Sequence, residues 1–318
     1  MQVGALSGGS CACVLLDCGE GTVPALQRAL GARAAQLAVA SLSCCFISHK
    51  HADHCLGLPS VLQARPARLP PLLVVAPAAV QVWMQEACPH LMDRAAFVHC
   101  ASFAAACFTS HAARPVAFGQ QAHAARAPQG AHKSAASSRQ ADGGANSALR
   151  QAGFVAGCCV RVRHCYDAYG IVLQHRHGWK VVYSGDTLAP CDALVKAGQN
   201  ATVLIHEATF ADEMAADAQA KRHSTISGAL QAAAQMRAWR VVLTHFSQRY
   251  SKYAPDAWMQ HARDAGSGSG PSNAQQNAML QSAVPAFDGL FVPFTVLQGL
   301  PALSHALMQC FTEAQTQP

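Results

Sequence analysis

The 318-residue chain has few charged residues and lacks an apolar run that could cross a membrane. Charged residues make up 13% of the sequence and apolar residues 51%, so a large core is expected and wholesale disorder is excluded. The best apolar run, Leu69–Met84, is broken by three prolines, and Ala101–Ala113 is too short and carries His111. The first ten residues lack the basic start and apolar stretch of a signal peptide. We therefore expect no membrane partner.

The chain also lacks a Cys-x-x-Cys pair, although it has 14 cysteines. The doublets Cys44–Cys45 and Cys158–Cys159 and several single cysteines lie within apolar runs. A chain of this length does not need disulfides for stability, and buried thiols are common in reducing compartments. We expect free cysteines that serve as small core residues of an intracellular protein.

The excess of positive charge is small and spread along the chain. The formal net charge is +6 at pH 7, with 16 histidines counted as neutral. Such a balance suits a polyanionic partner but does not by itself establish one.

Short apolar runs alternate with helical patterns, and polar clusters follow several of the runs. Buried strands are predicted at Ala12–Cys18, Leu42–Ser48, Pro71–Ala76, Val155–His164, Gly170–His175, Trp179–Ser184, Thr202–Ile205 and Val241–Leu243. Helical spacing is found in Val23–Ala40, Leu56–Gln63, Ala78–Ala87 and Thr225–Ala238. Strands separated by helices predict a layered α/β fold whose functional site lies on loops at the strand ends.

Two segments contain few large apolar residues. Residues 119–152 are rich in Ala, Gln, Ser, Gly and Arg, and residues 265–278 are rich in Gly, Ser, Asn and Gln. We expect a disordered, low-complexity insertion and a flexible segment within a single catalytic domain that spans residues 1–318.

The densest group of candidate metal ligands directly follows the predicted strand Leu42–Ser48. It consists of His49, His51, Asp53 and His54. Residues i and i+2 of an extended turn point to the same side, so His49 and His51 can bind one cation while Asp53 and His54 face a second. Imidazole and carboxylate are ligands that zinc prefers. A solvated histidine-rich loop is the alternative, but chance gives this pattern in only about one chain in several hundred of this composition.

Two cations need more ligands than this cluster supplies, and three later strand ends offer them: His164, Asp186 and His245. Each is a weak signal alone, because a single strand-end histidine is more often a hydrogen-bonded polar residue and Ser-Gly-Asp-Thr is an ordinary turn. In this order behind the histidine cluster, they predict a site for two metal ions.

Several further segments carry a resemblance to a known family. They are Leu15–Thr22 (LLDCGEGT), His51–Leu58 (HADHCLGL), Arg163–Gly170 (RHCYDAYG), Ser184–Thr187 (SGDT), His206–Thr209 (HEAT), His223–Thr225 (HST), Thr244–Tyr250 (THFSQRY) and Ala286–Asp288 (AFD). With them the chain resembles the metallo-β-lactamase superfamily and, more narrowly, the carboxy-terminal catalytic half of the long form of tRNase Z, the tRNA 3′-processing endonuclease family. The segment HEAT followed by HST distinguishes the narrower family from the rest of the superfamily, because lactamases and glyoxalase-II-like thioesterases are not expected to carry this pair.

The resemblance implies two zinc ions per chain and a role for each candidate residue. One ion is expected at His49, His51 and His164, the other at Asp53, His54 and His245, with Asp186 bridging both. Glu207 and His223 match the Glu–His pair of the family, in which the histidine protonates the leaving oxygen. Asp53 can also orient or deprotonate the attacking water. Without the resemblance, Glu207 reads as a core residue and Ser224 or Thr225 as a helix cap.

The same resemblance implies a fold, an activity and a compartment. The fold is a four-layer αβ/βα sandwich with the site between two sheets. The activity is removal of the 3′ trailer of precursor tRNA by a zinc-dependent endoribonuclease, leaving a 3′-hydroxyl tRNA and a 5′-phosphate trailer. Members of the family are expected in the nucleus, mitochondrion or plastid. No DNA partner is expected. Two alternatives stay open: another phosphodiesterase or thioesterase of the superfamily, or an incomplete or non-catalytic relative.

The chain departs from the family pattern at its start. The catalytic half normally opens with a Gly-rich strand-turn and a basic Pro-x-Lys-x-Arg-Asn loop, whereas only Met1–Ser10 precedes Cys11. We therefore expect the first sheet to lack its edge strands. We also expect weak RNA affinity from this chain alone, and a partner in the form of a homologous subunit or a missing amino-terminal half.

Overall fold

The computed structural model describes residues 2–7, 10–105, 148–247, 279, 281–300 and 302, which form two sheets and their flanking helices. The first sheet has the order β1 (Gln2–Ser7), β2 (Ser10–Leu16), β3 (Leu42–Phe46), β4 (Leu72–Ala76), β5 (Ala95–His99). The second has the order β11 (Ala283–Pro285), β10 (Arg240–Thr244), β9 (Val203–Glu207), β8 (Lys180–Tyr183), β7 (Tyr169–His175), β6 (Phe154–Arg161). Strands β2 to β5 are parallel, as are β8 to β11, whereas β1, β6 and β7 pair antiparallel with their neighbours.

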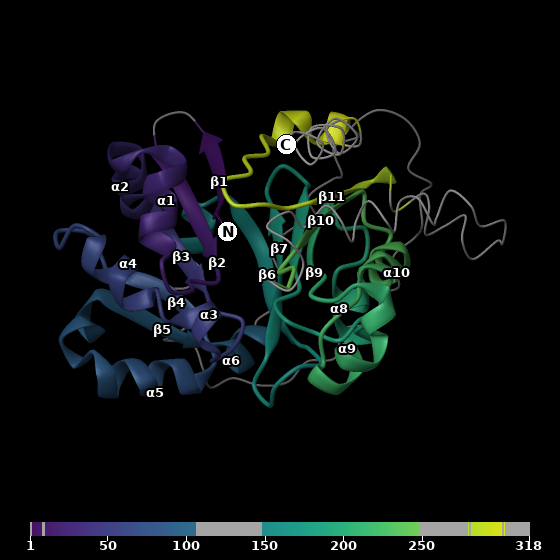
Figure 1. The fold of residues 1–318 in the computed structure, drawn as a ribbon. Helices are drawn as coiled ribbons and strands as arrows, with labels where there is room; N and C mark the ends of the chain where they lie inside the picture. Colours follow the sequence, from purple (N-terminus) through teal and green to yellow (C-terminus); the bar gives the residue numbers. More distant parts are fainter. Residues whose placement is uncertain are drawn as a thin grey trace, which may run out of the picture.

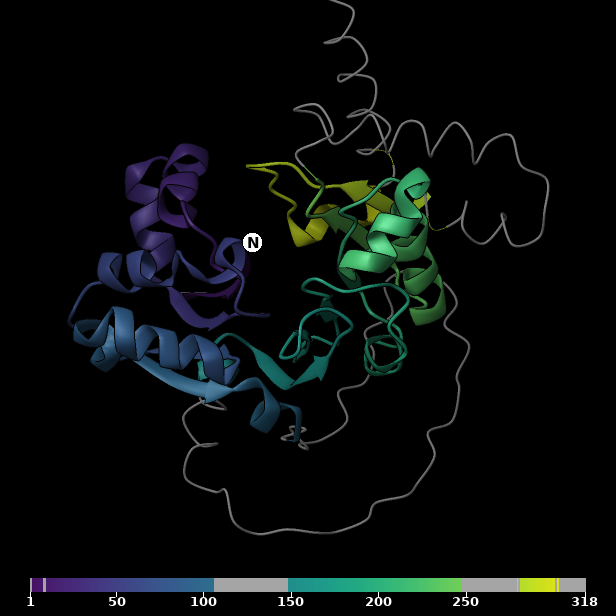
Figure 2. The ribbon, with the colours of Figure 1, turned by 60° about the horizontal axis from the view of Figure 1, so that its bottom comes forward.

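Helices flank the two sheets (Figures 1 and 2). In the first half they are α1 (Thr22–Leu30), α2 (Ala32–Ala40), α3 (Ala52–Cys55), α4 (Leu58–Ala64), α5 (Ala78–Ala87) and α6 (Cys100–Ala105), with the 3₁₀ turn η1 (Pro89–Arg94). In the second half they are α8 (Asp192–Ala197), α9 (Ala215–Lys221) and α10 (Ile226–Met236), with the 3₁₀ turns η2 (Asp212–Met214) and η3 (Phe294–Gly299). None of them, within the described ranges, has the length and apolar character of a membrane span.

Three apolar clusters fill the spaces between four layers. One joins the facing sides of the two sheets and includes Phe46, Ile171 and Ile205. A second packs the outer side of the first sheet against α4 and α5, and a third packs the outer side of the second sheet against α8 and α10. Alternate residues of one strand enter different clusters, as the period of two in a strand requires. The predicted four-layer αβ/βα sandwich is therefore confirmed.

The predicted single helix Val23–Ala40 is wrong in one respect, because it is two helices. α1 and α2 are separated by Gly31, whose φ of 81° lies in the left-handed region. Glycine adopts that region at no steric cost and ends helices there. The apolar spacing continues across the break, which is why the pattern alone does not reveal it.

The expected loss of edge strands from the first sheet is also corrected. Residues 2–7 form β1, which pairs antiparallel with β2 from Gln2 opposite Leu15 to Ser7 opposite Ser10. An edge strand requires backbone hydrogen bonds more than apolar side chains. The search for apolar runs therefore passed over it, together with the short elements β5, α6, α8 and β11.

The low-complexity insertion ends earlier than predicted. Residues 148–151 are helical, and Leu149 and Ala152 are 1% and 3% exposed within the cluster between the sheets. The remainder of that insertion, and the predicted flexible segment 265–278, lie outside the described residues. The 11 cysteines whose side chains the structure describes are all free, and burial raises the pKa of Cys44 to about 12, so this thiol stays protonated.

Two of the sequence segments meet through their backbones beside the histidine cluster. The amide of Gly57 donates to the carbonyl of Cys18 at 2.8 Å, and a Cβ added at Gly57 would lie 2.0 Å from the carbonyl oxygen of Gly19. We expect Gly57→Ala to lower the free energy of unfolding by about 2 kcal/mol and to weaken zinc binding, because rigid backbone must move. Denaturant unfolding and metal titration measure both. Gly299→Ala is the control, since no atom lies within 4 Å of its added Cβ; equal behaviour of the two variants would contradict this account.

Candidate metal centre

The predicted site residues gather where strands of both sheets end. His49 and His51 follow β3, and Asp53 and His54 lie in α3 directly after them. From the second sheet come His164 after β6, Asp186 after β8, Glu207 at the end of β9 and His245 after β10. Ligands commonly bind outside the carboxyl ends of parallel strands, so the topology places the site where the sequence predicts it.

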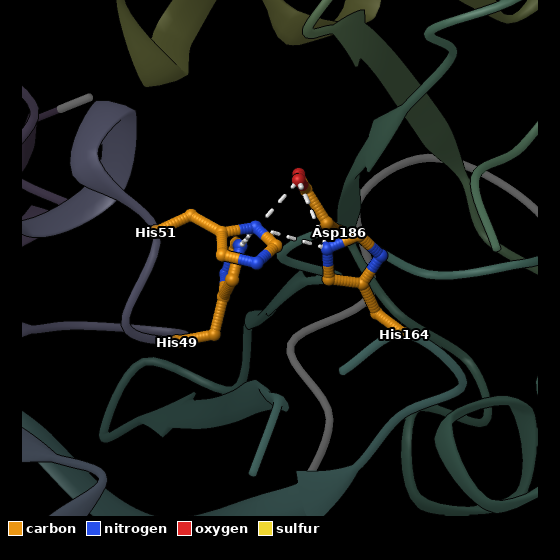
Figure 3. A group of neighbouring side chains, drawn as sticks. All are labelled: His49, His51, His164 and Asp186. Carbon is orange, nitrogen blue, oxygen red and sulfur yellow. Dashed lines mark hydrogen bonds and ion pairs between the residues drawn. The ribbon is translucent and has the colours of Figure 1, made fainter. Parts of the chain in front are cut away.

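Four side chains form a first group, with their polar atoms facing one another (Figure 3). His49 Nε2 lies 2.9 Å from His51 Nδ1, and His51 Nδ1 lies 3.3 Å from His164 Nε2. Asp186 Oδ2 lies 3.6 Å from His49 Nε2 and 3.8 Å from His164 Nε2. Three nitrogens and one carboxylate oxygen at these separations can surround a single cation.

A second group consists of Asp53, His54 and His245. Asp53 Oδ2 lies 3.4 Å from both His54 Nε2 and His245 Nε2. Asp186 reaches this group as well, since its two oxygens lie 3.2 Å from His54 Nε2 and 3.5 Å from His245 Nε2. Asp186 thus faces both groups, as a bridging ligand must.

Hydrogen bonds on the outer side of the site fix the tautomer of four of these histidines. His49 Nδ1 lies 2.9 Å from Ser48 Oγ, and His54 Nδ1 lies 2.6 Å from Asp17 Oδ2. His164 Nδ1 lies 3.0 Å from the Arg222 carbonyl, and His245 Nδ1 lies 2.8 Å from Thr209 Oγ1. The carboxylate and the carbonyl can only accept. The Ser48 and Thr209 hydroxyls donate to carboxylates and so accept from the rings. Each Nδ1 therefore carries a proton, and each Nε2 points inward, where the neutral ring can bind a cation.

Asp17 is the centre of the support on the first side. Besides the proton of His54, its carboxylate accepts from the Ser48 amide at 2.6 Å, the Ser48 hydroxyl at 2.8 Å and the Tyr183 hydroxyl at 2.6 Å. Burial alone would raise the pKa of Asp17, but the hydrogen bond and charge of His54 lower it below its usual value. A buried, ionised carboxylate thus holds two of the candidate ligand segments together.

The charges in the site favour a bound cation. Burial, with the nearby His54, lowers the pKa of His49 to about 3, so that this ring is neutral. Hydrogen bonds from His245 and His54 lower the pKa of Asp53. Although burial opposes it, the carboxylates of Asp17, Asp186 and Asp53 raise the pKa of His54. Ionised carboxylates that stabilise a proton here stabilise a metal ion at the same place.

The imidazole and carboxylate donors of the two groups fit zinc, the metal that the family resemblance implies. His54 Nε2 is buried and faces two carboxylates, those of Asp53 at 3.4 Å and Asp186 at 3.2 Å. Inward lone pairs on neighbouring rings repel one another unless a cation lies between them. Neutral imidazole and carboxylate, with the second ring nitrogen hydrogen-bonded, are the zinc ligands found in catalytic sites. The residues therefore suit zinc at both groups.

Glu207 and His223 form a pair at the margin of the site. Glu207 Oε1 accepts from the Thr187 amide at 2.8 Å and lies 2.9 Å from His223 Nδ1. Glu207 Oε2 accepts from the amides of Thr209 and Ser224, both at 3.1 Å, and from the Thr209 hydroxyl at 2.6 Å. The carboxylate is thus immobilised, and His223 directs its Nε2 away from it. Thr225 is the N-cap of α10, as the sequence predicts: its hydroxyl accepts a hydrogen bond from the Gly228 amide at 3.1 Å. This cap uses no hydrogen bond of Glu207.

The structure brings all nine predicted site residues together, but the sequence did not predict their supports. These are Asp17, Ser48, Tyr183, Thr209 and the carbonyl of Arg222. Asp17 and Thr209 lie inside segments that carry the family resemblance, so their positions were marked in the sequence although their role was not. The tautomers they fix depend on contacts between distant parts of the chain.

Comparison with known proteins places this geometry in a family. Residues 13–246 match the family described as "Beta-lactamase superfamily domain". The chain belongs to this superfamily.

Among curated proteins it is 39% identical over 246 residues to human "Zinc phosphodiesterase ELAC protein 2", covering 75% of this chain and 27% of that protein. It is 36% identical over 266 residues to "tRNase Z TRZ3, mitochondrial" of Arabidopsis thaliana, covering 75% of this chain and 29% of that protein. The chain thus spans less than a third of the length of these relatives. Among solved structures, a long form RNase Z from yeast superposes with a TM-score of 0.67 at 23% identity, over 96% of this chain and 40% of that one.

The hydrogen bonds of Asp17 predict a measurable effect on metal affinity. Asp17→Asn keeps the size of the side chain but loses the charge and one acceptor, so His54 and Ser48 are held less firmly. We expect zinc affinity to fall by about 10- to 100-fold, measured by competition with a chromogenic chelator. The control is Asp93→Asn, at an exposed aspartate. Zinc affinity equal to that of the unaltered protein would show that Asp17 does not position the ligands.

Proposed function

We propose that this chain is a zinc-dependent endoribonuclease that removes the 3′ trailer of precursor tRNA. The observation that carries the proposal is the inward convergence of two ligand groups on the shared carboxylate of Asp186, beside the Glu207–His223 pair. The relatives named zinc phosphodiesterase and tRNase Z support the substrate class. The products would be a tRNA with a 3′-hydroxyl and a trailer with a 5′-phosphate.

Each predicted residue has a role in this proposal. His49, His51 and His164 would hold one zinc ion, Asp53, His54 and His245 would hold a second, and Asp186 would be shared by both. When bound, the two ions supply an activated water and neutralise charge on the phosphoryl oxygens. Asp53, whose side chain is 66% exposed, accepts a hydrogen bond from the attacking water and orients it toward phosphorus. The outer hydrogen bonds keep the site from rearranging as charge develops.

The Glu207–His223 pair supplies the proton that the leaving oxygen needs. Glu207 accepts from His223 Nδ1 at 2.9 Å, which keeps the ring in one orientation. His223 then donates from Nε2 to the departing ribose 3′-oxygen. A histidine suits this step because its ordinary pKa lies near neutrality, so that it can both carry and release a proton.

The finer aspects of partner and compartment belong to the same proposal. Because the chain covers 27% of the human relative, we propose that a homologous subunit or an amino-terminal half like that of the long forms supplies further RNA contacts. Two relatives from Arabidopsis thaliana are named as mitochondrial, and we propose that this chain acts inside an organelle.

The experiment is cleavage of a precursor tRNA with a 3′ trailer, together with zinc analysis of the purified chain. We expect about two zinc ions per chain and a single cut that leaves a 3′-hydroxyl. Hydrolysis of bis(p-nitrophenyl) phosphate without cleavage of the precursor, also after adding a homologous amino-terminal half, would instead favour a phosphodiesterase for small substrates. Protein that binds no zinc would favour a non-catalytic relative.

A further inference from the structure

An exposed tyrosine lies on the loop that carries one of the candidate zinc ligands. Tyr166 is 86% exposed, the highest value among the large apolar and aromatic side chains of the described residues. It follows His164 by two residues, so its Cα lies within about 7 Å of that of His164. Its backbone therefore lies close to that of a candidate zinc ligand.

The loop around Tyr166 is fixed at both ends. The Val162 amide donates to the Ala168 carbonyl at 3.0 Å, which closes the loop at its base. On one flank, the Leu188 amide donates to the Arg163 carbonyl at 2.9 Å. On the other, Arg222 Nη1 donates to the His164 carbonyl at 2.8 Å, while His164 Nδ1 donates to the Arg222 carbonyl. The ring is thus presented by a firmly held backbone rather than by a free tip.

A cation supports the ring from one side. The guanidinium carbon of Arg161 lies 5.1 Å from the centroid of Tyr166 and 6.0 Å from that of Tyr169, and Arg161 also donates to the Tyr166 carbonyl. The neighbouring Asp167 is hydrogen-bonded by Tyr169, whose pKa is raised to about 12 by burial and by that carboxylate. Arg163 and Arg222, both exposed, add positive charge on either side of His164.

An aromatic face open to solvent, backed by arginine and carried two residues from a candidate ligand of the proposed cleavage site, is suited to one ligand chemistry. Stacking on an aromatic ring binds a nucleobase, and the nearby guanidinium groups bind the phosphates of the same strand. A base within a duplex cannot offer its face, so the ligand must be single-stranded at this point.

We propose that Tyr166 stacks on an unpaired nucleobase of single-stranded RNA and so places the adjoining phosphodiester at the metal centre. This inference rests on the proposed endoribonuclease activity and adds a specific contact to it. Tyr166 is a positioning residue, and Arg161 holds its ring. The contact gives the chain a means of binding the unpaired 3′ end of an RNA through its own residues.

The test is the affinity of the full chain for a fluorescent 12-nucleotide single-stranded RNA, measured by anisotropy. We expect Tyr166→Ala to weaken binding about tenfold and Tyr166→Phe to retain it, because stacking needs the ring and not the hydroxyl. Phe291→Ala removes another exposed aromatic, 78% exposed and in the carboxy-terminal segment, and should leave the affinity unchanged.

A scan with abasic nucleotides separates stacking from a general structural effect. One or two positions should bind the unaltered chain more weakly when the base is removed, and Tyr166→Ala should abolish that difference. Equal RNA affinity of Tyr166→Ala and the unaltered chain, or a base preference that survives in this variant, would overturn the inference. So would failure of the unaltered chain to bind the RNA.

Cleavage of a precursor tRNA, followed in parallel, keeps the two proposals distinct. If the chain cleaves the precursor but binding does not depend on Tyr166, the positioning role is wrong and the proposed function stands. If binding depends on Tyr166 but the precursor is never cut, the stacking contact stands and the proposed function is wrong.

Discussion

Replacing Asp186 by alanine is expected to abolish RNA cleavage and to lower the zinc content in the same variant. Asp186 is 3% exposed, and its oxygens lie within 3.8 Å of the nitrogens of four candidate ligand histidines. Without it, the two groups share no ligand, and the rings of His49, His51 and His164 face one another with no carboxylate between them. We expect cleavage to fall by more than about 10³-fold, which is roughly 4 kcal/mol of transition-state stabilisation.

Two measurements check this expectation: zinc per chain by elemental analysis and single-turnover cleavage of a precursor tRNA. Asp93→Ala is the matched control at an exposed position. Circular dichroism in the presence of zinc establishes that the variant is folded. An Asp186→Ala protein with two zinc ions and full activity would refute the assignment of a shared ligand.

Replacing His223 by alanine is expected to slow RNA cleavage while the metal stays bound. His223 is held by Glu207 at 2.9 Å, whereas its Nδ1 lies 3.9 Å from Asp186. Loss of a general acid costs about 10²- to 10⁴-fold. A p-nitrophenolate leaving group needs no proton, so hydrolysis of bis(p-nitrophenyl) phosphate should fall far less than cleavage of RNA.

The comparison of the two substrates, with His90→Ala as the control at an exposed histidine, makes the test specific. His223 also lies near enough to Asp186 and His245 to be considered a metal ligand. A fall in zinc content in His223→Ala would therefore reassign the residue from acid to ligand. Equal losses on both substrates would eliminate the proposed proton transfer.

Sequence reasoning went furthest where the chemistry depends on residue type. The four residues His49, His51, Asp53 and His54 stand out because their spacing is rare, and strand ends identified the partners from the second half of the chain. Their supports were not predictable in this way. Asp17 and Ser48 are common residue types, and their effect on His54 and His49 exists only because β2 and β3 run side by side.

The same limit applies to the fold. Strands with strongly apolar runs, such as β3 and β4, were predicted nearly to the residue. β1 and β11 were not, because they are defined by pairing with β2 and β10 rather than by their composition. Gly31 shows the converse case, in which a local backbone preference overrides an apolar pattern that continues on both sides.

The candidate ligands come from both sheets, so metal binding is coupled to the stability of the folded chain. His49, His51, Asp53 and His54 follow a strand of the first sheet, whereas His164, Asp186 and His245 follow strands of the second. Metal ions that bind only the folded chain stabilise the association of the two sheets. Each tenfold rise in free metal above the dissociation constant raises the free energy of unfolding by a further ~1.4 kcal/mol per ion. The concentration of free zinc would then set the stability of the folded chain as well as the occupancy of its candidate metal sites.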